Sequence, residues 1–573
     1  MKLLWKQTFK NMYQNKSYVM ILFLLTSLTS FMYFFVRFSI DMNLPAIEQL
    51  LQTGVDLSEN QQKYVTALQS NTILANNFLI VSLLLSAFVF YMFYKRYFTL
   101  HQKEIGCYKA LGFTNTEISR LFVLFSFMIC SVATLVGLIG GWFGSDIMID
   151  ASKASYNIEE VQKGINLISF FYGVCLVIIV LAVITLLACS QFFKKDAALL
   201  ISGKDSQKEN RIIIAISNKL ANLFPEKSRF SIRIALRKPM TILLTITAVG
   251  AVTTLFIMSF SLNLSSQKVF SSQTKGHHYN YNTRFDSYQY GSLEDSEIVY
   301  YLRAPIEEEA KTGLRQVIGV NATGTLLELE SMNNERLAIP KGEYVIINPA
   351  LVELYGLQIG DTMTFMINGQ VRIAVISHIA QNAEADTVYI SKTQLAKWLN
   401  VPNDAYSGVW SKKLIKGDHA NVITKEQRLD ELDQAAVSNR ISGVINQVIG
   451  CVIGILLIYL VLLLNFQDSL KDILVLNLLG YSPKKINNML ITVYRPIIWI
   501  AFIIMLYPSI WMVKSIQKGL SIQTEDYMPF QTNLSIILAV FLIINMIYSI
   551  VQIFFHKKIR RIVKQEKTAD YVN

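Results

Sequence analysis

Charged residues are scarce in this chain of 573 residues: Asp, Glu, Lys and Arg make up 16% of it, against 52% for hydrophobic residues. Soluble domains carry about 25% charged residues, so this deficit indicates that lipid is a main solvent of the chain. Cysteine is equally scarce, and each of the five lies in or beside an apolar run. No disulfide framework is therefore expected in the polar part of the chain. The cysteines are Cys107, Cys130, Cys175, Cys189 and Cys451.

Eight apolar runs approach the length of about 20 residues that a bilayer-spanning helix needs. None of them has an acidic residue in its middle, which argues against an ion or proton pathway. The first run is longer than the apolar core of a signal peptide and no A-x-A site follows it, so we expect an uncleaved span. The runs are Tyr18–Val36, Phe78–Tyr94, Leu121–Phe143, Leu167–Cys189, Thr241–Phe260, Val444–Leu464, Ile491–Val513 and Leu534–Phe555.

The net charge of +12 is distributed unevenly between the connections. If the N-terminus is inside, the connections on its side carry about +20 and those on the other side about −8. This asymmetry follows the positive-inside rule and predicts a multi-pass protein with both termini in the cytoplasm. No basic–aromatic module remains once the topology signal is subtracted, so no nucleic-acid partner is predicted.

The region 263–439, between the fifth and sixth runs, has the composition of a soluble domain, and its middle part predicts a mixed α/β fold. Strand-like 343–347 precedes a short helix at 349–355, and Asn368-Gly369 marks a hairpin turn between 362–366 and 371–376. A second helix is expected at 391–399. The polar helical pattern of 425–440 runs directly into the sixth span, which predicts a rigid stalk.

Neither catalytic residues nor a metal site is predicted in this domain. Its histidines show no H-E-x-x-H or Cys/His ligand spacing, so they are expected at the surface. The run Glu307-Glu308-Glu309 is interpreted as a solvated helix face. The histidines are His277, His278, His378 and His419.

The eight spans form two sets of four, because the segment after the second span recurs after the sixth at a constant offset of 368 residues. Glu104 aligns with Asp472, and Leu111-Gly112-Phe113-Thr114 aligns with Leu479-Gly480-Tyr481-Ser482. Internal repeats of this kind are common in membrane proteins. Ile105 and Ile473 also align, as do Ile118 and Ile486.

The predicted fold is thus a polytopic α-helical membrane protein of two four-helix repeats, with a mixed α/β extracytoplasmic domain between helices five and six. Each repeat opens with a basic amphipathic stretch, Leu3–Lys16 and Phe230–Pro239, which fits either an interfacial elbow helix or a simple positive-inside flank. The expected parts are a first half (1–193), a cytoplasmic linker (194–227), an elbow with the fifth helix (228–262), the outer domain (263–439) and the last three helices with a basic tail (440–573).

Lys103-Glu104-Ile105-Gly106 through Ala110-Leu111-Gly112-Phe113 resembles the cytoplasmic motif of FtsX/MacB-type (type VII) ABC transporter permeases. Residues Glu343–Gly369 resemble the extracytoplasmic core domains of that superfamily. The second copy of the motif departs from the first, with Asp472 as the acid, Lys471 just before it and Pro483 in the turn. The chain contains no G-x-x-x-x-G-K-[ST] loop, so the resemblance implies that ATP and Mg²⁺ are bound by separate ATP-binding subunits, two per permease. No cofactor is expected in this chain itself.

The resemblance also implies that these segments are coupling helices that dock an ATPase. Apolar knobs would enter a cleft on the partner, and the glycines would permit the tight turn. The two acids would either pair with basic residues of the partner or cap a local helix. The alternative is that both segments are ordinary interfacial loops. The knobs are Leu111, Phe113, Leu479 and Tyr481, the turn glycines Gly112 and Gly480, and the acids Glu104 and Asp472.

Polar and small residues inside the spans are interpreted as packing features rather than ligand sites. Asn446 and Gln447 are expected to make an interhelical hydrogen bond, and Arg495 to snorkel to the inner surface. Small-residue ladders predict close helix contacts, at Gly137, Gly140, Gly141 and Gly144 in the third span and at Gly450 and Gly454 in the sixth.

Taken with the resemblance, the sequence predicts the permease subunit of an ABC exporter or resistance system in a bacterial plasma membrane. Its ligand would be an amphiphilic or antimicrobial peptide or a lipid-linked molecule at the outer face, and the mechanism would be mechanotransmission. Bacitracin- and lantibiotic-resistance permeases are distantly similar, although their plan is longer, with ten spans. The alternative is an FtsX-like transducer that transports nothing and controls a cell-wall hydrolase or a sensor kinase. An enzyme in the membrane is a third, weaker reading.

Overall fold

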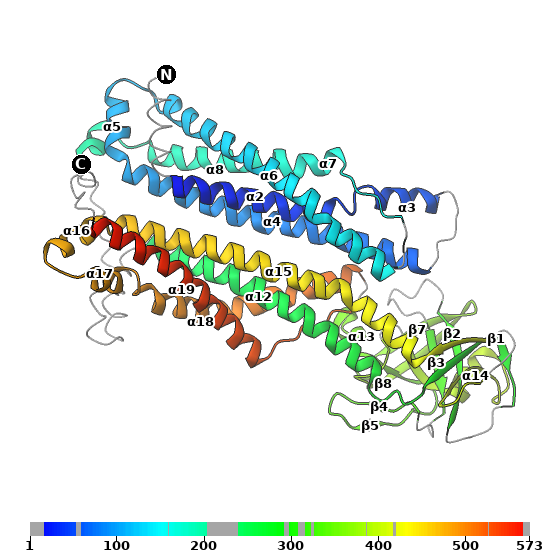
Figure 1. The fold of residues 1–573 in the computed structure, drawn as a ribbon. Coiled ribbons are helices and arrows are strands. Elements are labelled where there is room, and N and C mark those ends of the chain that lie inside the picture. Colours follow the sequence, from blue (N-terminus) through cyan, green and yellow to red (C-terminus); the bar gives the residue numbers. More distant parts are fainter. Residues whose placement is uncertain are drawn as a thin grey trace. The chain divides into compact units, whose positions relative to one another are not determined.

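Figure 1 shows the computed structural model of the chain, and the structural statements below concern the residues that it describes. These are 16–52, 59–156, 158, 160–202, 239–291, 297–306, 316–321, 326–384, 387–415, 420–524 and 527–564. Both expected elbow helices lie almost entirely outside these ranges. Most of the expected linker, Glu307-Glu308-Glu309 and His419 also lie outside them.

Eight helices in the described residues are long and apolar enough to cross a membrane, as the sequence predicts. They fall between Tyr18–Arg37 and Leu534–Arg561, and the mixed α/β domain lies between the fifth and the sixth of them. The chain is therefore a multi-pass membrane protein with one inserted polar domain.

The first four spans belong to a bundle that we call the first bundle, in which α2 packs along α6 and α4, and α8 along α6 and α4. In its described part, the segment between α2 and α4 contains a turn at residues 38–42 and the helix α3. The helices are α2 (Lys16–Arg37), α3 (Asn43–Gln52), α4 (Glu59–Leu100), α5 (Gln102–Ala110), α6 (Asn115–Tyr156), α7 (Leu167–Phe170), the π-helical turn η1 (Phe171–Leu176), α8 (Val177–Phe192) and α9 (Ala197–Ser202).

Small residues bring α6 close to α2. A Cβ added at Gly141 would lie 2.6 Å from the Cβ of Phe34, and one at Gly144 would lie 2.9 Å from Cδ2 of Phe35. A Cβ at Gly137 would meet the backbone of α2 at Ser27, and one at Gly140 would lie 3.2 Å from Cδ2 of Phe31. Helices in lipid associate through such close van der Waals contact, so this ladder accounts for the tight α2–α6 pair without any ligand.

The second bundle contains α12 (Pro239–Thr274), α15 (Lys425–Asp468), α16 (Leu470–Leu478), α17 (Pro483–Leu490), α18 (Tyr494–Thr524) and α19 (Leu534–Lys564). The two glycines predicted to form a ladder in the sixth span are packed less tightly than Gly141 and Gly144 of α6. A Cβ at Gly450 would lie 3.3 Å from the Phe256 ring, and one at Gly454 would lie 3.0 Å from Ile547. Asn446 is buried, but its Oδ1 has no hydrogen-bond partner in the described part of the chain.

Arg495 makes contacts that the snorkelling interpretation does not include. Its Nη2 donates to Ser549 Oγ at 2.9 Å and to Gln552 Oε1 at 3.3 Å, and its guanidinium lies 5.3 Å from the centre of the Tyr548 ring. The guanidinium therefore ties α18 to α19 rather than simply extending to the inner surface. A hydroxyl and an amide oxygen on α19, about one helical turn apart, both accept from its Nη2.

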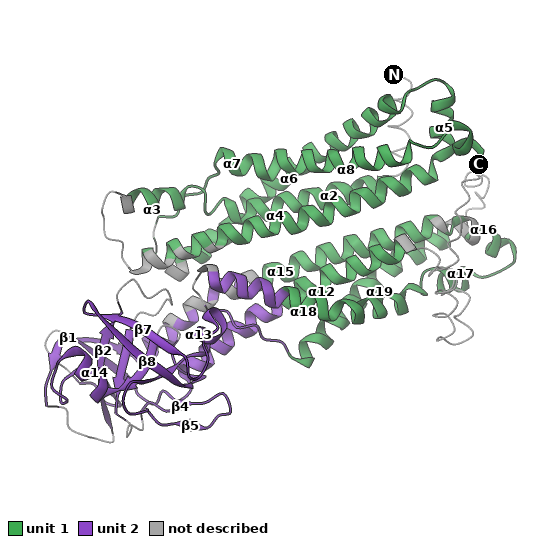
Figure 2. Ribbon diagram, turned by 180° about the vertical axis from the view of Figure 1, so that it is seen from behind, with its two compact units in different colours: residues 1–258, 444–512, 533–573 green, residues 259–443, 513–532 purple. Residues whose placement is uncertain are grey.

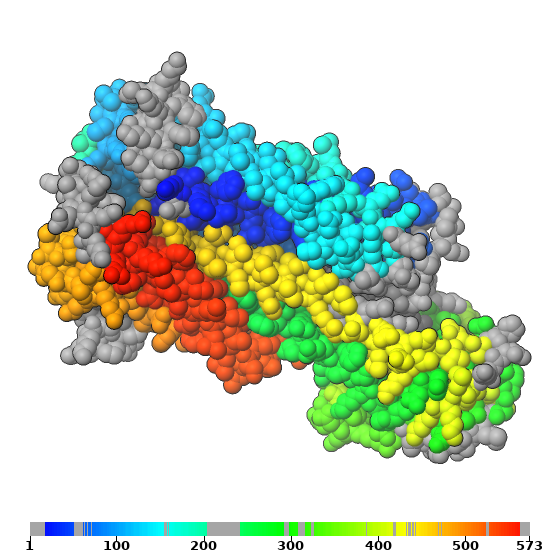
Figure 3. Space-filling model, in the orientation of Figure 1, coloured from blue at the N-terminus to red at the C-terminus, as the bar shows by residue number. Residues whose placement is uncertain are grey.

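The surfaces of α6 and α19 present apolar side chains outward, as lipid-facing helices do. On α19 the exposed residues recur about every fourth position, and Figure 3 shows this helix in red and α6 in cyan at the surface of the molecule. The exposed apolar residues of α19 are Leu534, Leu538, Leu542, Met546, Ile550, Ile553 and Phe554.

The chain divides into two compact units, which Figure 2 distinguishes by colour. One contains the first bundle and most of the second. The other, here called the sheet domain, consists of residues 259–443 and 513–532. The second of these segments includes the end of α18, where Gln517 Oε1 accepts a hydrogen bond from Ser261 Oγ of α12 at 3.0 Å. Glu353 interacts with Lys514 and Lys518 in the same region.

A nine-stranded mixed sheet forms the sheet domain, in the order β11-β1-β10-β2-β3-β9-β6-β8-β7. The pairs β3–β9 and β6–β8 are parallel, and the other pairs are antiparallel. The strands are β1 (Tyr281–Gln289), β2 (Ile298–Pro305), β3 (Gln316–Val320), β6 (Tyr344–Ile347), β7 (Thr362–Ile367), β8 (Gln370–Ile379), β9 (Thr387–Ser391), β10 (Tyr406–Ser411) and β11 (Ala420–Thr424), with the separate pair β4 (Leu329–Glu330) and β5 (Arg336–Leu337).

The locally encoded parts of this domain match the sequence prediction. The β7–β8 hairpin turns at Asn368 and Gly369, whose φ angles of 51° and 70° suit a tight two-residue turn. The short helix α13 (Pro349–Tyr355) is capped by the Asn348 side chain, which accepts from Leu351 N at 3.1 Å. The second helix is α14 (Lys392–Leu399), and α15 is continuous from Lys425 through the sixth span.

Two apolar cores cover parts of the two faces of the sheet. One contains Phe365, Ile376 and Leu395 beneath α13 and α14. The other is aromatic: the Trp410 ring stacks between Tyr301 and Tyr279, with ring centroids 4.4 Å and 5.4 Å away. Tyr279 of this second core also contacts Arg428 of α15.

Candidate functional site

The helices α5 and α16 end in the same backbone geometry, and these two ends are here called the docking turns. In the first, Gly112 N donates to Lys109 O at 3.0 Å, and Phe113 N donates to Tyr108 O at 3.2 Å. In the second, Gly480 N donates to Asn477 O at 2.9 Å and Tyr481 N to Leu476 O at 3.0 Å. Both are Schellman caps, in which the residue after the cap must be left-handed.

The left-handed position explains why both docking turns contain glycine. Gly112 has φ 89° and Gly480 has φ 83°, and no neighbouring atom lies within 4 Å of a Cβ added at either. Since space is available, the backbone angle alone is what disfavours a side chain.

Alanine at Gly112 or Gly480 should therefore fray each turn without any clash. The left-handed conformation costs an L-residue about 1–2 kcal/mol, which corresponds to roughly five- to thirtyfold faster opening. Hydrogen exchange of the peptides that contain Phe113 and Tyr481 measures this opening. Gly519→Ala is the control, because Gly519 also has free space but lies within α18 without a positive φ. Equal effects at all three positions would contradict this account.

Apolar residues around the docking turns divide into buried anchors and exposed knobs. Ile105 and Ile473 are buried at matching positions, and so are Ile118 and Ile486. In contrast, the side chains of Leu111 and Leu479 are 74% and 68% exposed. The aligned residues thus serve either to hold each turn on its bundle or to project from it.

The aromatic knobs are less exposed than the leucines. Phe113 and Tyr481 are both half-buried, and the Lys485 ammonium lies 4.8 Å from the centre of the Tyr481 ring. Leu478, which the sequence analysis did not single out, is 80% exposed. Its counterpart in the first repeat is Ala110, so the repeat alignment gave no signal for it.

Of the two aligned acids, Glu104 and Asp472, only Glu104 has a side chain within the described residues. Glu104 lies in the first turn of α5, and its Oε1 is 3.2 Å from Nδ1 of His101. Glu104 therefore has a local partner at the start of its own helix, although 46% of its side chain stays exposed. The side chain of Asp472 lies outside the described residues.

The element after each docking turn differs between the bundles. In the first, Thr114 and Glu117 form a reciprocal capping box: Thr114 N donates to Glu117 Oε2 at 2.9 Å, and Glu117 N to Thr114 Oγ1 at 3.3 Å. The helix α6 then continues unbroken to Tyr156. In the second, α17 starts with Pro483 at its first turn, a position that suits proline because its missing N–H would be unpaired there anyway.

A break separates α17 from α18 at residues 491–493, within the seventh span. Side chains from neighbouring helices satisfy carbonyls near the break: Asn465 Nδ2 donates to Leu490 O at 2.7 Å, and the Tyr548 hydroxyl donates to Ile491 O at 2.8 Å. The Tyr494 hydroxyl donates to Asn465 Oδ1 at 2.9 Å. Non-helical backbone inside a membrane requires such partners, so the break is a built feature.

The helix α5 also contacts the segment that follows α8. Lys109 Nζ donates to Phe193 O at 2.9 Å and also to Lys195 O. The helix α9 crosses α5 at Gly106, where an added Cβ would lie 2.9 Å from the Cβ of Leu200. Gly106, which belongs to the motif quoted above, is therefore required for this close approach.

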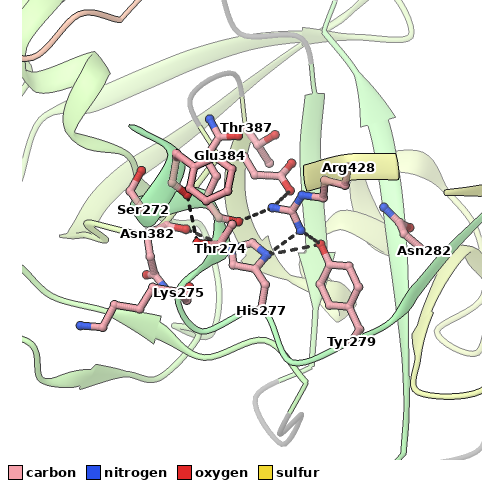
Figure 4. Close-up of polar contacts among 12 residues, drawn as sticks. Ser272, Thr274, Lys275, His277, Tyr279, Asn282, Asn382, Glu384, Thr387 and Arg428 are labelled. Carbon is pink, nitrogen blue, oxygen red and sulfur yellow. Dashed lines mark hydrogen bonds and ion pairs between the residues drawn. The ribbon is translucent and has the colours of Figure 1, made fainter. Parts of the chain in front are cut away.

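A polar cluster in the sheet domain was not predicted (Figure 4). Arg428, near the start of α15, reaches both His277 and Tyr279, which follow α12: its Nη1 lies 3.1 Å from His277 Nδ1 and also contacts the Tyr279 hydroxyl. Its Nη2 donates to Gln273 O at 2.6 Å and forms an ion pair with Glu384 at 3.2 Å.

The expectation that His277 is a surface residue was wrong, since only 5% of it is exposed. Arg428 can only donate, so Nδ1 of His277 must accept, and Nε2 donates to Asn382 O at 3.2 Å. Burial, together with the Arg428 guanidinium, lowers the pKa of His277 to about 3. The ring is therefore neutral at physiological pH. Sequence spacing gave no sign of this, because the groups that contact His277 include Asn382 and Arg428, which lie 105 and 151 residues later in the chain.

The two segments that contain the docking turns both match one known family. The model of the FtsX-like permease C-terminal domain matches twice, at residues 76–197 and 447–563. Each match contains three membrane spans and one docking turn. These two matched segments are consistent with two FtsX-like repeats, and the matched family suggests a membrane component of an ABC-type system with an ATPase partner. No curated protein matched the chain.

The described residues contain no group of three or more His, Cys, Asp or Glu side chains that could hold a metal ion. Each docking turn offers an exposed leucine on a rigid cap, next to charged side chains.

Proposed function

We propose that the chain is the permease of an ABC system and that its two docking turns bind two separate ATP-binding subunits. The observation that carries this proposal is the duplication of one geometry: two Schellman caps at matched positions, each holding a leucine about 70% exposed. An apolar side chain on a fixed turn can fill a cleft of a partner. ATP and Mg²⁺ would be held entirely by those partners.

Helix length supports the transmission of motion to the sheet domain. At 1.5 Å per residue, the 36 residues of α12 and the 44 residues of α15 span about 54 Å and 66 Å. The hydrocarbon core is only about 30 Å thick. Both helices therefore extend well beyond it without interruption, so movement of their membrane portions would reach the domain directly.

The proposed membrane is the bacterial plasma membrane, with both termini and both docking turns in the cytoplasm and the sheet domain outside. The charge asymmetry of the connections supports this orientation. Because the spans alternate in direction, the connections that contain α5 and α16 lie on one side and the sheet domain on the other.

Thiol labelling of intact cells tests this orientation. The native Cys107 on α5 is exposed, and Met332 in the sheet domain is a 59% exposed side chain suited to replacement by cysteine. An impermeant maleimide should label Met332→Cys in intact cells and Cys107 only after permeabilisation. The reverse pattern would show that the proposed orientation is wrong.

The ligand that we propose is an amphiphilic peptide or a lipid-linked molecule at the outer face, which the complex exports or removes. Co-purification with the candidate ATP-binding subunit, followed by ATPase assays in nanodiscs, tests the complex and then the ligand. Ligand-stimulated hydrolysis would support transport. If hydrolysis instead responds only to a cell-wall hydrolase or a sensor kinase, the transducer function is correct. Failure to form any complex would refute the assignment.

A further inference from the structure

Arg428 lies within the sheet domain, close to the end of α12 and the start of α15. It belongs to α15, yet its guanidinium bonds the Gln273 carbonyl at the end of α12 and three side chains of the sheet domain. Figure 4 shows these contacts converging on one side chain. The side chain is only 17% exposed, and its partner Glu384 is 19% exposed. Charge-assisted hydrogen bonds in such a shielded place are strong and geometrically specific.

One partner of Arg428, His277, is held in turn by Asn382. Asn382 is fully buried, and its amide donates to Lys275 O at 2.9 Å and to Glu328 O at 2.7 Å, while its Oδ1 accepts from Glu330 N at 2.8 Å. Its carbonyl holds the His277 ring. The end of α12 is thus connected to the β4 strand through one side chain.

The start of α15 is fixed as well. Thr424 N donates to Gln427 Oε1 at 2.9 Å, and Gln427 N donates to Thr424 Oγ1 at 3.1 Å, which is a capping box. Strand β11 ends at Thr424, directly before the helix, and pairs with β1. Arg428 therefore lies one turn into a helix whose start belongs to the sheet.

We propose that Arg428 is a positioning residue that joins α12, α15 and the sheet into one rigid body, so that a movement of either helix moves the whole domain. This inference rests on the proposed function, in which the docking turns drive the bundles. Arginine suits the role because it stays charged and offers its donors in a fixed fork, which one side chain can distribute over several acceptors.

A small cavity adjoins the joint without offering a ligand site. Its volume is about 20 Å³, room for about one water molecule. Arg428, His277 and Asn282 contribute to its lining. The cluster is therefore assigned a mechanical role rather than a role in binding the transported molecule.

The test uses the full complex in nanodiscs, with the five native cysteines replaced by alanine and spin labels at Met332→Cys and Tyr507→Cys. Met332 is in the sheet domain, and Tyr507 is a 78% exposed residue of α18 in the other unit. Electron–electron distance measurements compare the nucleotide-free and ATP-bound complexes. With Arg428 intact, ATP should shift the distance distribution as a whole.

Arg428→Met keeps the stem and removes the fork. We expect a broad distribution that ATP no longer shifts, while the amount of bound ATP-binding subunit stays unchanged. Arg440→Met on the same helix is the matched control, because within the described residues Arg440 pairs with Asp433 at an exposed position; it should behave like the wild type. Glu384→Gln, which keeps an acceptor and removes the charge, should reduce the shift in a domain that remains folded.

Different results separate the joint from the proposed function. A normal ATP-dependent shift in both Arg428→Met and Glu384→Gln would overturn the role of Arg428. A wild-type complex that binds the subunit but shows no shift would overturn the joint and the transmission to the domain together. Absence of a complex would instead reject the docking proposal itself.

Discussion

Replacement of both Leu111 and Leu479 by aspartate should abolish capture of the ATP-binding subunit. Burying a leucine in an apolar cleft contributes about 1.5–3 kcal/mol, and an unpaired carboxylate in the same cleft adds a further cost. About 3 kcal/mol per site corresponds to more than a hundredfold weaker binding. Because both leucines point into solvent, the chain itself should fold normally. Affinity measured on immobilised permease in nanodiscs gives the result.

Met332→Asp is the control for this experiment, because Met332 is similarly exposed but lies in the sheet domain. It should leave binding unchanged. Each single substitution should weaken binding less than the pair does, because the other docking turn remains. Leu478→Asp tests whether the second turn uses a wider apolar surface than the first. If the double variant keeps its subunits, the docking turns are not the interface.

The sheet domain should lose stability as the pH falls from 7 to 5. The folded pKa of His277 is about 3, whereas an unfolded histidine has a pKa of about 6.5. Between these values the unfolded chain binds a proton that the folded domain excludes, so stability falls as the pH decreases. This one group should account for about 2 kcal/mol between pH 7 and pH 5, and up to about 5 kcal/mol at lower pH.

Pulse proteolysis of the full chain in urea, at pH 7 and at pH 5, measures this loss. His277→Gln should make the stability of the sheet domain less dependent on pH, because glutamine can accept from Arg428 without titrating in this range. His378→Gln is the matched control, since His378 is exposed in the same domain. An unchanged pH dependence in His277→Gln would assign the effect to other groups.

Local signals made much of the fold predictable. Long apolar runs gave the eight spans, and Asn368-Gly369 gave the β7–β8 hairpin through turn chemistry alone. Asn348 and Pro349 marked the start of α13, since a side-chain cap and a proline in the first turn act within a few residues. The docking turns were also recognisable, because a Schellman cap needs a glycine at one fixed position.

Features that depend on distant parts of the chain were not predictable. The order of the nine strands pairs β3 with β9 and β1 with both β10 and β11, across long loops. The burial of His277 was not predictable because Arg428, which contacts it, lies 151 residues later in the chain. The break at residues 491–493 lies in a largely apolar stretch, and side chains that bond it come from other helices: Asn465 and Tyr548 donate to carbonyls beside it, and Gln552 donates to Thr492 Oγ1 at 2.7 Å.

Because of that break, the helices that follow the two docking turns differ in length and continuity. Behind the first docking turn stands α6, one uninterrupted rod of 42 residues, with α9 supporting α5 from behind. Behind the second stands an eight-residue helix that ends within the seventh span. If two ATP-binding subunits moved the two docking turns equally, α6 would therefore move as one rigid helix, whereas the second half would bend at residues 491–493. Equal movements of the two partners would thus produce unequal movements of the two bundles.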